Sequence, residues 1–356
     1  MLTNDICRGT IQSHFDISTN DTTRDDIATI RERCAEMEER MERMENTKNM
    51  ENMENMATNT LQGESTQEAN MRKEPAKKKG WTAVAAAFLI VLAFLAIQLV
   101  ISTAWGVISM VQFAVKAGGD MAAATEAYTD YMMNSGIQTI ILLVVYIVCS
   151  AVGLLWYKKG YVKKYTQQMR ADFKERVLQV RTIVTLVLAG IGCYCIAVLI
   201  SSLVAYISPG SMELYNFVMG SALSGDAVVA FITTVILAPI AEELFFRGII
   251  IRKLLSSNGV TAAIVIQAVL FGLYHLNPLQ FFFVLPLGIV MGYAAYKLNS
   301  VIPCILIHAV NNFMPYVVSA LPEKMRVIGV FLVAAVICCG LILLLNRKAI
   351  GAKSHA

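Results

Sequence analysis

Two adjacent carboxylates, Glu242 and Glu243, lie well inside an apolar stretch that otherwise has the character of a membrane span. Arg247 follows one helical turn after Glu243, so these two side chains share a helix face and can form a charge-assisted pair. Glu242 projects about 100° away from that face and has no such partner. Because two neighbouring carboxylates cannot both ionise cheaply at low dielectric, we expect Arg247 to hold one ionised and the other to suit the work of a general base. Pro239, three residues before Glu242, is expected to loosen the helix and free a backbone carbonyl.

Two later apolar stretches carry further polar side chains. Phe271 and His275 share one helix face, and His308 and Asn312 share another. Taken one at a time, the three sets have structural explanations: an ion pair that docks helices, a capped interfacial histidine, and a hydrogen bond between helices. Together they come from three different spans in a region with almost no other ionisable side chain. This combination indicates a functional site inside the membrane.

The composition requires a membrane protein. Of the 356 residues, 56% are hydrophobic and only 16% are charged, against roughly 25% charged in a soluble domain. Residues 81–356 hold 10 of the 26 acids and 18 of the 30 bases, and apolar runs of 18 or more residues recur there. The net charge of +4 is therefore no sign of nucleic-acid binding, because the excess base flanks the membrane. The eight cysteines show neither a disulfide framework nor zinc-finger spacing, and no signal peptide is visible.

Residues 81–356 predict an all-α fold: a polytopic membrane helix bundle with about eight transmembrane helices. We expect these helices near 81–112, 137–157, 182–208, 226–252, 259–276, 279–297, 301–320 and 326–346. On these boundaries His275 lies at the far end of a short fifth span, on the order of 10 Å from the depth of Glu242 and His308. Either the fifth span starts deeper than Gly259, or an irregular cavity brings the groups together.

The charge of the connections predicts the orientation. Bases gather just before the first span and in the 158–181 connection, whereas acids dominate the 113–136 connection. The positive-inside rule then puts both termini in the cytoplasm, and an even number of crossings agrees with that. We expect a multi-pass protein in the plasma membrane of a bacterium.

Residues 1–80 form a polar cytoplasmic arm that we expect to be mostly disordered. One part is periodic, with apolar residues at alternating spacings of three and four: Ile27, Ile30, Cys34, Met37, Met41 and Met44. This pattern predicts a short amphipathic or coiled-coil helix near 27–56. The helix is either part of a tether or a means of self-association.

The motifs, taken in order, resemble a known family. Glu242-Glu243-Leu-Phe-Phe-Arg247, Phe271-Gly-Leu-Tyr-His275 and His308-Ala-Val-Asn-Asn312 follow one another on successive membrane helices. This set is similar to that of the CAAX prenyl protease and bacteriocin-processing family, also called the Abi family. The resemblance covers roughly 225–320, about a quarter of the chain, and we expect the catalytic core there.

The resemblance implies an intramembrane, glutamate-dependent endopeptidase that works without a metal. It makes Glu242 the base that activates water, and His275 a helper that holds that water. His308 and Asn312 would stabilise the oxyanion, and Glu243 and Arg247 would support the site. Hydrolysis of a peptide bond does need an activated water, a proton donor for the leaving amine and donors toward the developing O⁻.

Two other interpretations remain open. Glu242, His275 and His308 could instead form a zinc site with an open position for water, although the His-Glu-x-x-His motif is absent. A non-catalytic membrane protein is the other: an immunity or scaffolding factor, or a transporter that uses Glu242 as a proton relay.

The expected partners are membrane lipid and a peptide or prenylated protein as substrate. The resemblance, and no residue in the chain, supplies this substrate class.

Overall fold

The computed structural model describes residues 77–162 and 173–351, with nine residues of the arm between 36 and 50. The chain divides into two units, residues 1–73 and 74–356. The described arm residues are helical and exposed, and Met44 is the one member of the predicted apolar stripe among them. Ile27, Ile30, Cys34, Met37 and Met41 lie outside the described residues, so the disorder and the self-association of the arm stay predictions.

The second unit is a bundle of helices, and no strand occurs in its described ranges, which confirms the all-α fold. Eight helical stretches occupy the predicted ranges to within a few residues. They are α3 (Lys77–Lys116), α5 (Ile137–Tyr157), α7 (Val180–Ile207), a composite helix from Ala227 to Leu255, α12 (Val260–Tyr274), α13 (Pro278–Leu298), α14 (Ile302–Ser319) and α15 (Ile328–Gly351).

Seven of these eight helices are long and apolar enough to cross a membrane. The exception is α12, whose 15 residues span about 22 Å at 1.5 Å per residue, against a hydrocarbon core of about 30 Å. The prediction of about eight transmembrane helices agrees with the described ranges, where seven helices have the length of a crossing and the eighth, also apolar, is shorter.

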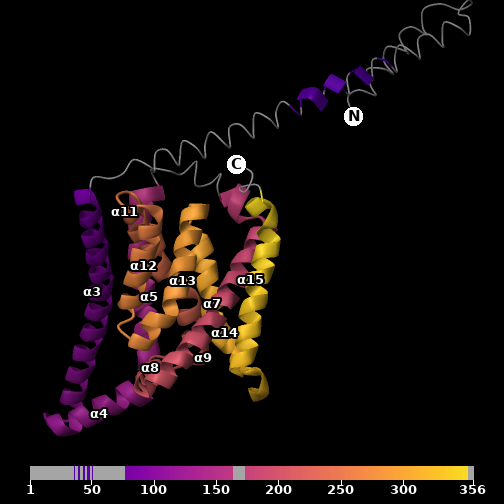
Figure 1. The fold of residues 1–356 in the computed structure, drawn as a ribbon. Coiled ribbons are helices and arrows are strands. Elements are labelled where there is room, and N and C mark those ends of the chain that lie inside the picture. The colour runs from indigo at the N-terminus through magenta and orange to yellow at the C-terminus, as the bar shows by residue number, and fades with distance from the viewer. Residues whose placement is uncertain are drawn as a thin grey trace, which may run out of the picture. The chain divides into compact units, whose positions relative to one another are not determined.

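Two helices appear where the sequence was expected to form polar connections. They are α4 (Met121–Asn134) and α8 (Pro209–Ala222), each of 14 residues. Their starts carry ordinary signals: the Asp120 carboxylate accepts hydrogen bonds from the backbone N–H groups of Ala122 and Ala123, and Pro209 occupies the first helical position of α8. Neither helix is long enough to span a bilayer, so the long apolar runs of the sequence do not reveal them. Figure 1 shows both at the end of the bundle opposite the start of α3.

The helices α3 and α15 lie at opposite edges of the bundle (Figure 1), whereas the composite helix is the most buried of the long helices. In the most apolar part of the composite helix 56% of the residues are buried, against 17% in α3 and 17% in α15. The composite helix is built of α9 (Ala227–Phe231), a π-helical turn η3 (Ile232–Leu237), α10 (Ala238–Glu243), a second π-helical turn η4 (Leu244–Ile250) and α11 (Ile251–Leu255). Shorter π-helical or 3-10 turns are η1 (Lys158–Val162), η2 (Phe173–Val177) and η5 (Glu323–Met325).

Glycines let two helices approach the centre closely. A Cβ atom on Gly153 of α5 would lie 3.1 Å from the Leu244 and Phe245 side chains of η4. A Cβ atom on Gly190 of α7 would lie 2.8 Å from the backbone oxygen of Ile307, next to His308. Both positions therefore favour glycine, and they hold α5 and α7 against the helices that carry the polar motifs.

Candidate active site

The helix that carries the two glutamates is wound more widely on both sides of them. The N–H of Ala238 donates to the oxygen of Thr233, and the N–H of Ile251 donates to the oxygen of Phe246, five residues back in each case. In this register the donor for the Thr234 oxygen would be residue 239, and that residue is proline, which has no N–H. The predicted effect of Pro239 is thus assigned to one carbonyl, that of Thr234.

Asn312 of α14 satisfies this carbonyl. Its Nδ2 donates to the Thr234 oxygen at 3.0 Å, while its Oδ1 accepts a hydrogen bond from Asn311 at 3.2 Å. One of the two N–H groups of the Asn312 amide is therefore committed to the composite helix. The other remains for a further acceptor.

Glu243, Arg247 and His308 form a compact charged group. Arg247 Nη1 donates to Glu243 Oε1 at 2.8 Å, so the ion pair expected from the spacing is present. His308 Nδ1 lies 2.8 Å from the same oxygen. Since an ionised carboxylate only accepts hydrogen bonds, Nδ1 carries the proton and donates. All three side chains are buried, with 0%, 1% and 4% of their surface exposed.

Glu242 faces a different set of groups, as its position on the helix predicts. It is 3% exposed, and its Oε1 accepts a hydrogen bond from the hydroxyl of Tyr146 on α5 at 2.9 Å. Its Oε2 lies 3.9 Å from Nε2 of His308. That distance is too long for a direct hydrogen bond and short enough for both atoms to bind the same water molecule.

His275 joins this group through an aromatic ring. Its Nδ1 hydrogen-bonds to the backbone oxygen of Phe271 at 2.8 Å, and its ring meets the Phe271 ring edge-on at 4.9 Å between centroids. The same Phe271 ring contacts the His308 ring at 5.8 Å and lies 4.4 Å from the guanidinium carbon of Arg247. Phe271, fully buried, therefore links all three motifs.

The observed helix bounds remove most of the expected difference in depth. Glu242 lies thirteen residues before the end of α11 at Leu255, and His275 lies fifteen residues after the start of α12 at Val260. At 1.5 Å per residue, both are roughly 20 Å from the turn that joins the two helices. Because the composite helix continues to Leu255, three residues beyond its expected end, His275 reaches the level of Glu242 without an irregular cavity.

Several contributors were not identified from the sequence. Tyr146 is one, and nothing in its local sequence marks it, since its partner lies 96 residues away. The backbone oxygen of Gly288 on α13 is another: it accepts hydrogen bonds from Gln267 Nε2 at 2.8 Å and from Arg247 Nη2 at 3.4 Å. A buried glutamine on an apolar helix was the one available signal, since it needs partners.

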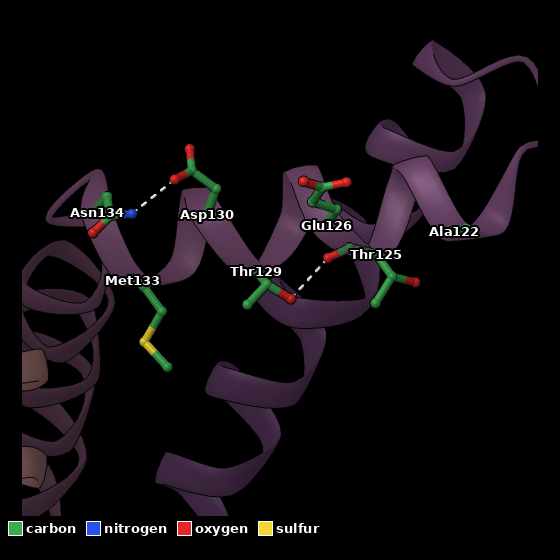
Figure 2. A pocket seen from close by; sticks show the side chains of 7 residues that line it. All are labelled: Ala122, Thr125, Glu126, Thr129, Asp130, Met133 and Asn134. Atoms are coloured by element: carbon green, nitrogen blue, oxygen red, sulfur yellow. Dashed lines mark hydrogen bonds between the residues drawn. The ribbon is translucent and has the colours of Figure 1, made fainter.

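A shallow pocket elsewhere in the bundle contains none of these residues. It follows one side of α4 and is lined by Ala122, Thr125, Glu126, Thr129, Asp130, Met133 and Asn134 (Figure 2). Its polar groups are partly satisfied within the helix, as by the bonds from Asn134 to Asp130 and from Thr129 to the Thr125 backbone oxygen, both at 2.7 Å. It offers no base or nucleophile comparable to Glu242 and His308.

A zinc site in this region would need three ligating side chains and an open position for water. Among the described residues, no three His, Cys, Asp or Glu side chains are grouped so that they could hold a metal ion. The zinc alternative built on Glu242, His275 and His308 stays a prediction and is decided by experiment. His275 Nδ1 hydrogen-bonds to a backbone oxygen and Glu242 Oε1 accepts from Tyr146, bonds that a metal ligand also makes with the atom that does not bind the metal.

One comparison with known proteins is informative. Residues 223–314 match a family model described as "Type II CAAX prenyl endopeptidase Rce1-like". The matched segment contains all six predicted site residues and runs from just before the composite helix into α14. No curated protein and no solved structure matches the chain.

Proposed function

We propose that this integral, multi-pass membrane protein hydrolyses a peptide bond at the site around Glu242, within residues 223–314, which match the Rce1-like type II CAAX prenyl endopeptidase family model. The observation that carries the proposal is the 3.9 Å separation of Glu242 Oε2 and His308 Nε2. A water molecule bound between these two atoms can transfer its proton to the carboxylate while the imidazole orients it.

The reaction runs in two proton transfers. The Glu242 carboxylate takes a proton from the water as the oxygen attacks the scissile carbonyl carbon, and the negative charge moves to the carbonyl oxygen. Donors near that oxygen stabilise the tetrahedral intermediate. As the C–N bond breaks, protonated Glu242 returns the proton to the leaving amine, which restores the carboxylate.

His308 and Asn312 are the proposed oxyanion donors. Asn312 keeps one N–H after its bond to the Thr234 oxygen. His308 donates through Nε2 when the ring is an imidazolium, because Glu243 already holds Nδ1. Two carboxylates, one guanidinium and one imidazolium sum to zero charge, so in this state these four side chains carry no net charge.

The remaining residues position these groups. Glu243 fixes the orientation of the His308 ring, and Arg247 balances the charge of Glu243. His275 presents its free Nε2 at the same depth and helps to hold the water.

The substrate is proposed to be a membrane-associated or prenylated peptide, the class that the family description names. Both termini are proposed to face the cytoplasm of a bacterium. The start of α3 and the end of α15 lie on the same side of the bundle (Figure 1), which supports a common side for the two ends.

The test is cleavage of a membrane-anchored peptide by the purified protein in lipid. Glu242→Gln removes the base while keeping its shape, and we expect kcat to fall by about 10²–10⁴-fold. Glu213→Gln, at an exposed position of α8, is the matched control and should keep full activity. The proposal is wrong if Glu242→Gln and His275→Ala both retain full activity. If the protein acts as an immunity or scaffolding factor in cells and Glu242→Gln keeps that cellular effect, the non-catalytic interpretation is favoured.

The metal-free character of the reaction has its own test. We expect strong chelators to leave cleavage unchanged and the purified protein to hold no stoichiometric metal. Activity lost on chelation and restored by zinc would replace this mechanism with the zinc alternative.

A further inference from the structure

The hydroxyl of Tyr146 is the group that hydrogen-bonds to the proposed base. It donates to Glu242 Oε1 at 2.9 Å from α5, a helix outside the segment that matches the family model. Gly153 lies two turns further along the same face of α5, where a Cβ atom would press on Leu244 and Phe245. The close packing at Gly153 therefore holds the α5 backbone, and with it Tyr146, against the helix that carries Glu242.

Tyr146 is itself the end of a series of polar groups. Gln98 of α3 donates through Nε2 to the hydroxyl of Tyr274 on α12 at 2.8 Å. Because an amide nitrogen only donates, the Tyr274 oxygen accepts and its own hydrogen is free to turn toward Tyr146, with which it interacts. The Tyr146 hydrogen is committed to Glu242, so in a hydrogen bond between the two tyrosines Tyr274 has to be the donor. Hydrogen bonds aligned in this way strengthen one another.

We propose that Tyr146 is a positioning residue of Glu242: by holding Oε1, it leaves Oε2 as the oxygen that meets His308 and the water. This inference rests on the proposed function. The titratable and charged groups that face Glu242 are Cys149 and Tyr146 of α5, Tyr274 of α12, His308 of α14, and Glu243 and Arg247 of its own helix. Of these described groups, Tyr146 is the one within hydrogen-bond distance of the carboxylate.

Loss of the hydroxyl has two expected consequences. The carboxylate becomes free to rotate, which misdirects Oε2, and its ionised form loses a charge-assisted hydrogen bond. For Tyr146→Phe we expect kcat to fall about 10- to 100-fold, the usual size of such a bond, with KM changed by less than about threefold. Because the ionised form is the one that loses support, the acidic limb of the kcat profile should move to higher pH.

The experiment compares Tyr146→Phe with Tyr293→Phe, which removes a hydroxyl from an exposed position of α13 and should change nothing. Gln98→Leu interrupts the series two groups away, so a smaller fall in kcat and a smaller shift of the same limb are expected. If Tyr146→Phe does not fold, Gln98→Leu takes its place in the test. The proposal is then overturned if the acidic limb of the kcat profile of Gln98→Leu stays at the pH of the parent. If Glu242→Gln is inactive while Tyr146→Phe keeps kcat and the pH profile, the inference on Tyr146 fails alone. If Glu242→Gln is active, the proposed function fails first.

Discussion

The composite helix and α15 both satisfy the length and composition of a membrane span, yet they solve opposite problems. In the most apolar part of the composite helix more than half of the residues are buried. The helix as a whole holds two buried carboxylates and a buried guanidinium. In the most apolar part of α15 about a sixth of the residues are buried, and residues such as Val336 and Ile337 are more than half exposed. A helix facing lipid must be apolar all round, whereas a helix surrounded by protein can carry charge wherever a neighbour supplies a partner.

The largest expected effect comes from removing one partner of the buried ion pair. Arg247→Met leaves Glu243 fully buried without its cation, and we expect a loss of about 3–5 kcal/mol in stability. Thermal unfolding in a fixed detergent or lipid measures it. The double variant Glu243→Gln with Arg247→Met is the control and should recover most of the loss, because no uncompensated charge remains. Equal stability of Arg247→Met and the parent would mean that protein partners do not explain why this helix tolerates charge.

The reciprocal change places a carboxylate on the helix that has no partner for it. Val336→Asp lies near the middle of α15 on a side chain that is 65% exposed, and we expect insertion to become less favourable by about 2.5–3.5 kcal/mol. An assay of membrane insertion of the α15 segment gives this value directly. Val336→Leu should insert as well as the parent, and normal insertion of the aspartate variant would contradict the assignment of this face to lipid.

A smaller effect tests how the wide winding of the composite helix is supported. Asn312→Ala leaves the Thr234 oxygen without its donor, at a cost of about 1–3 kcal/mol. In a Pro239→Ala background residue 239 regains an N–H in the five-residue register, so the same substitution should cost less. A double-mutant cycle on unfolding free energies should show coupling above about 0.5 kcal/mol. Strict additivity would show that Pro239 is not what frees the Thr234 carbonyl.

The sequence predicted most of this arrangement wherever the signal is local. Long apolar runs gave the eight helices, and a spacing of four residues gave the Glu243–Arg247 pair. What it could not give depends on contacts between distant segments. The partner of His308 is a glutamate 65 residues away, and Tyr146 meets Glu242 across 96 residues. The π-helical turns and the depth of His275 depend on how the helices pack against one another. Packing of this kind produces no periodic pattern in a single sequence.

The smallest expected effect concerns the turn that follows His275. Leu276 has φ 52°, a left-handed conformation that costs an ordinary residue about 1–2 kcal/mol, and its side chain is 77% exposed, so little packing offsets that cost. Leu276→Gly should therefore raise stability by up to about 1 kcal/mol in thermal unfolding, because glycine adopts this conformation freely. The matched control is Leu273→Gly, three residues earlier and 51% exposed but inside α12, where glycine should lower stability by about 1 kcal/mol. Opposite signs for two Leu→Gly changes one turn apart would locate the end of α12 at His275. If both changes destabilise equally, the helix continues past His275 and Leu276 does not adopt the left-handed conformation.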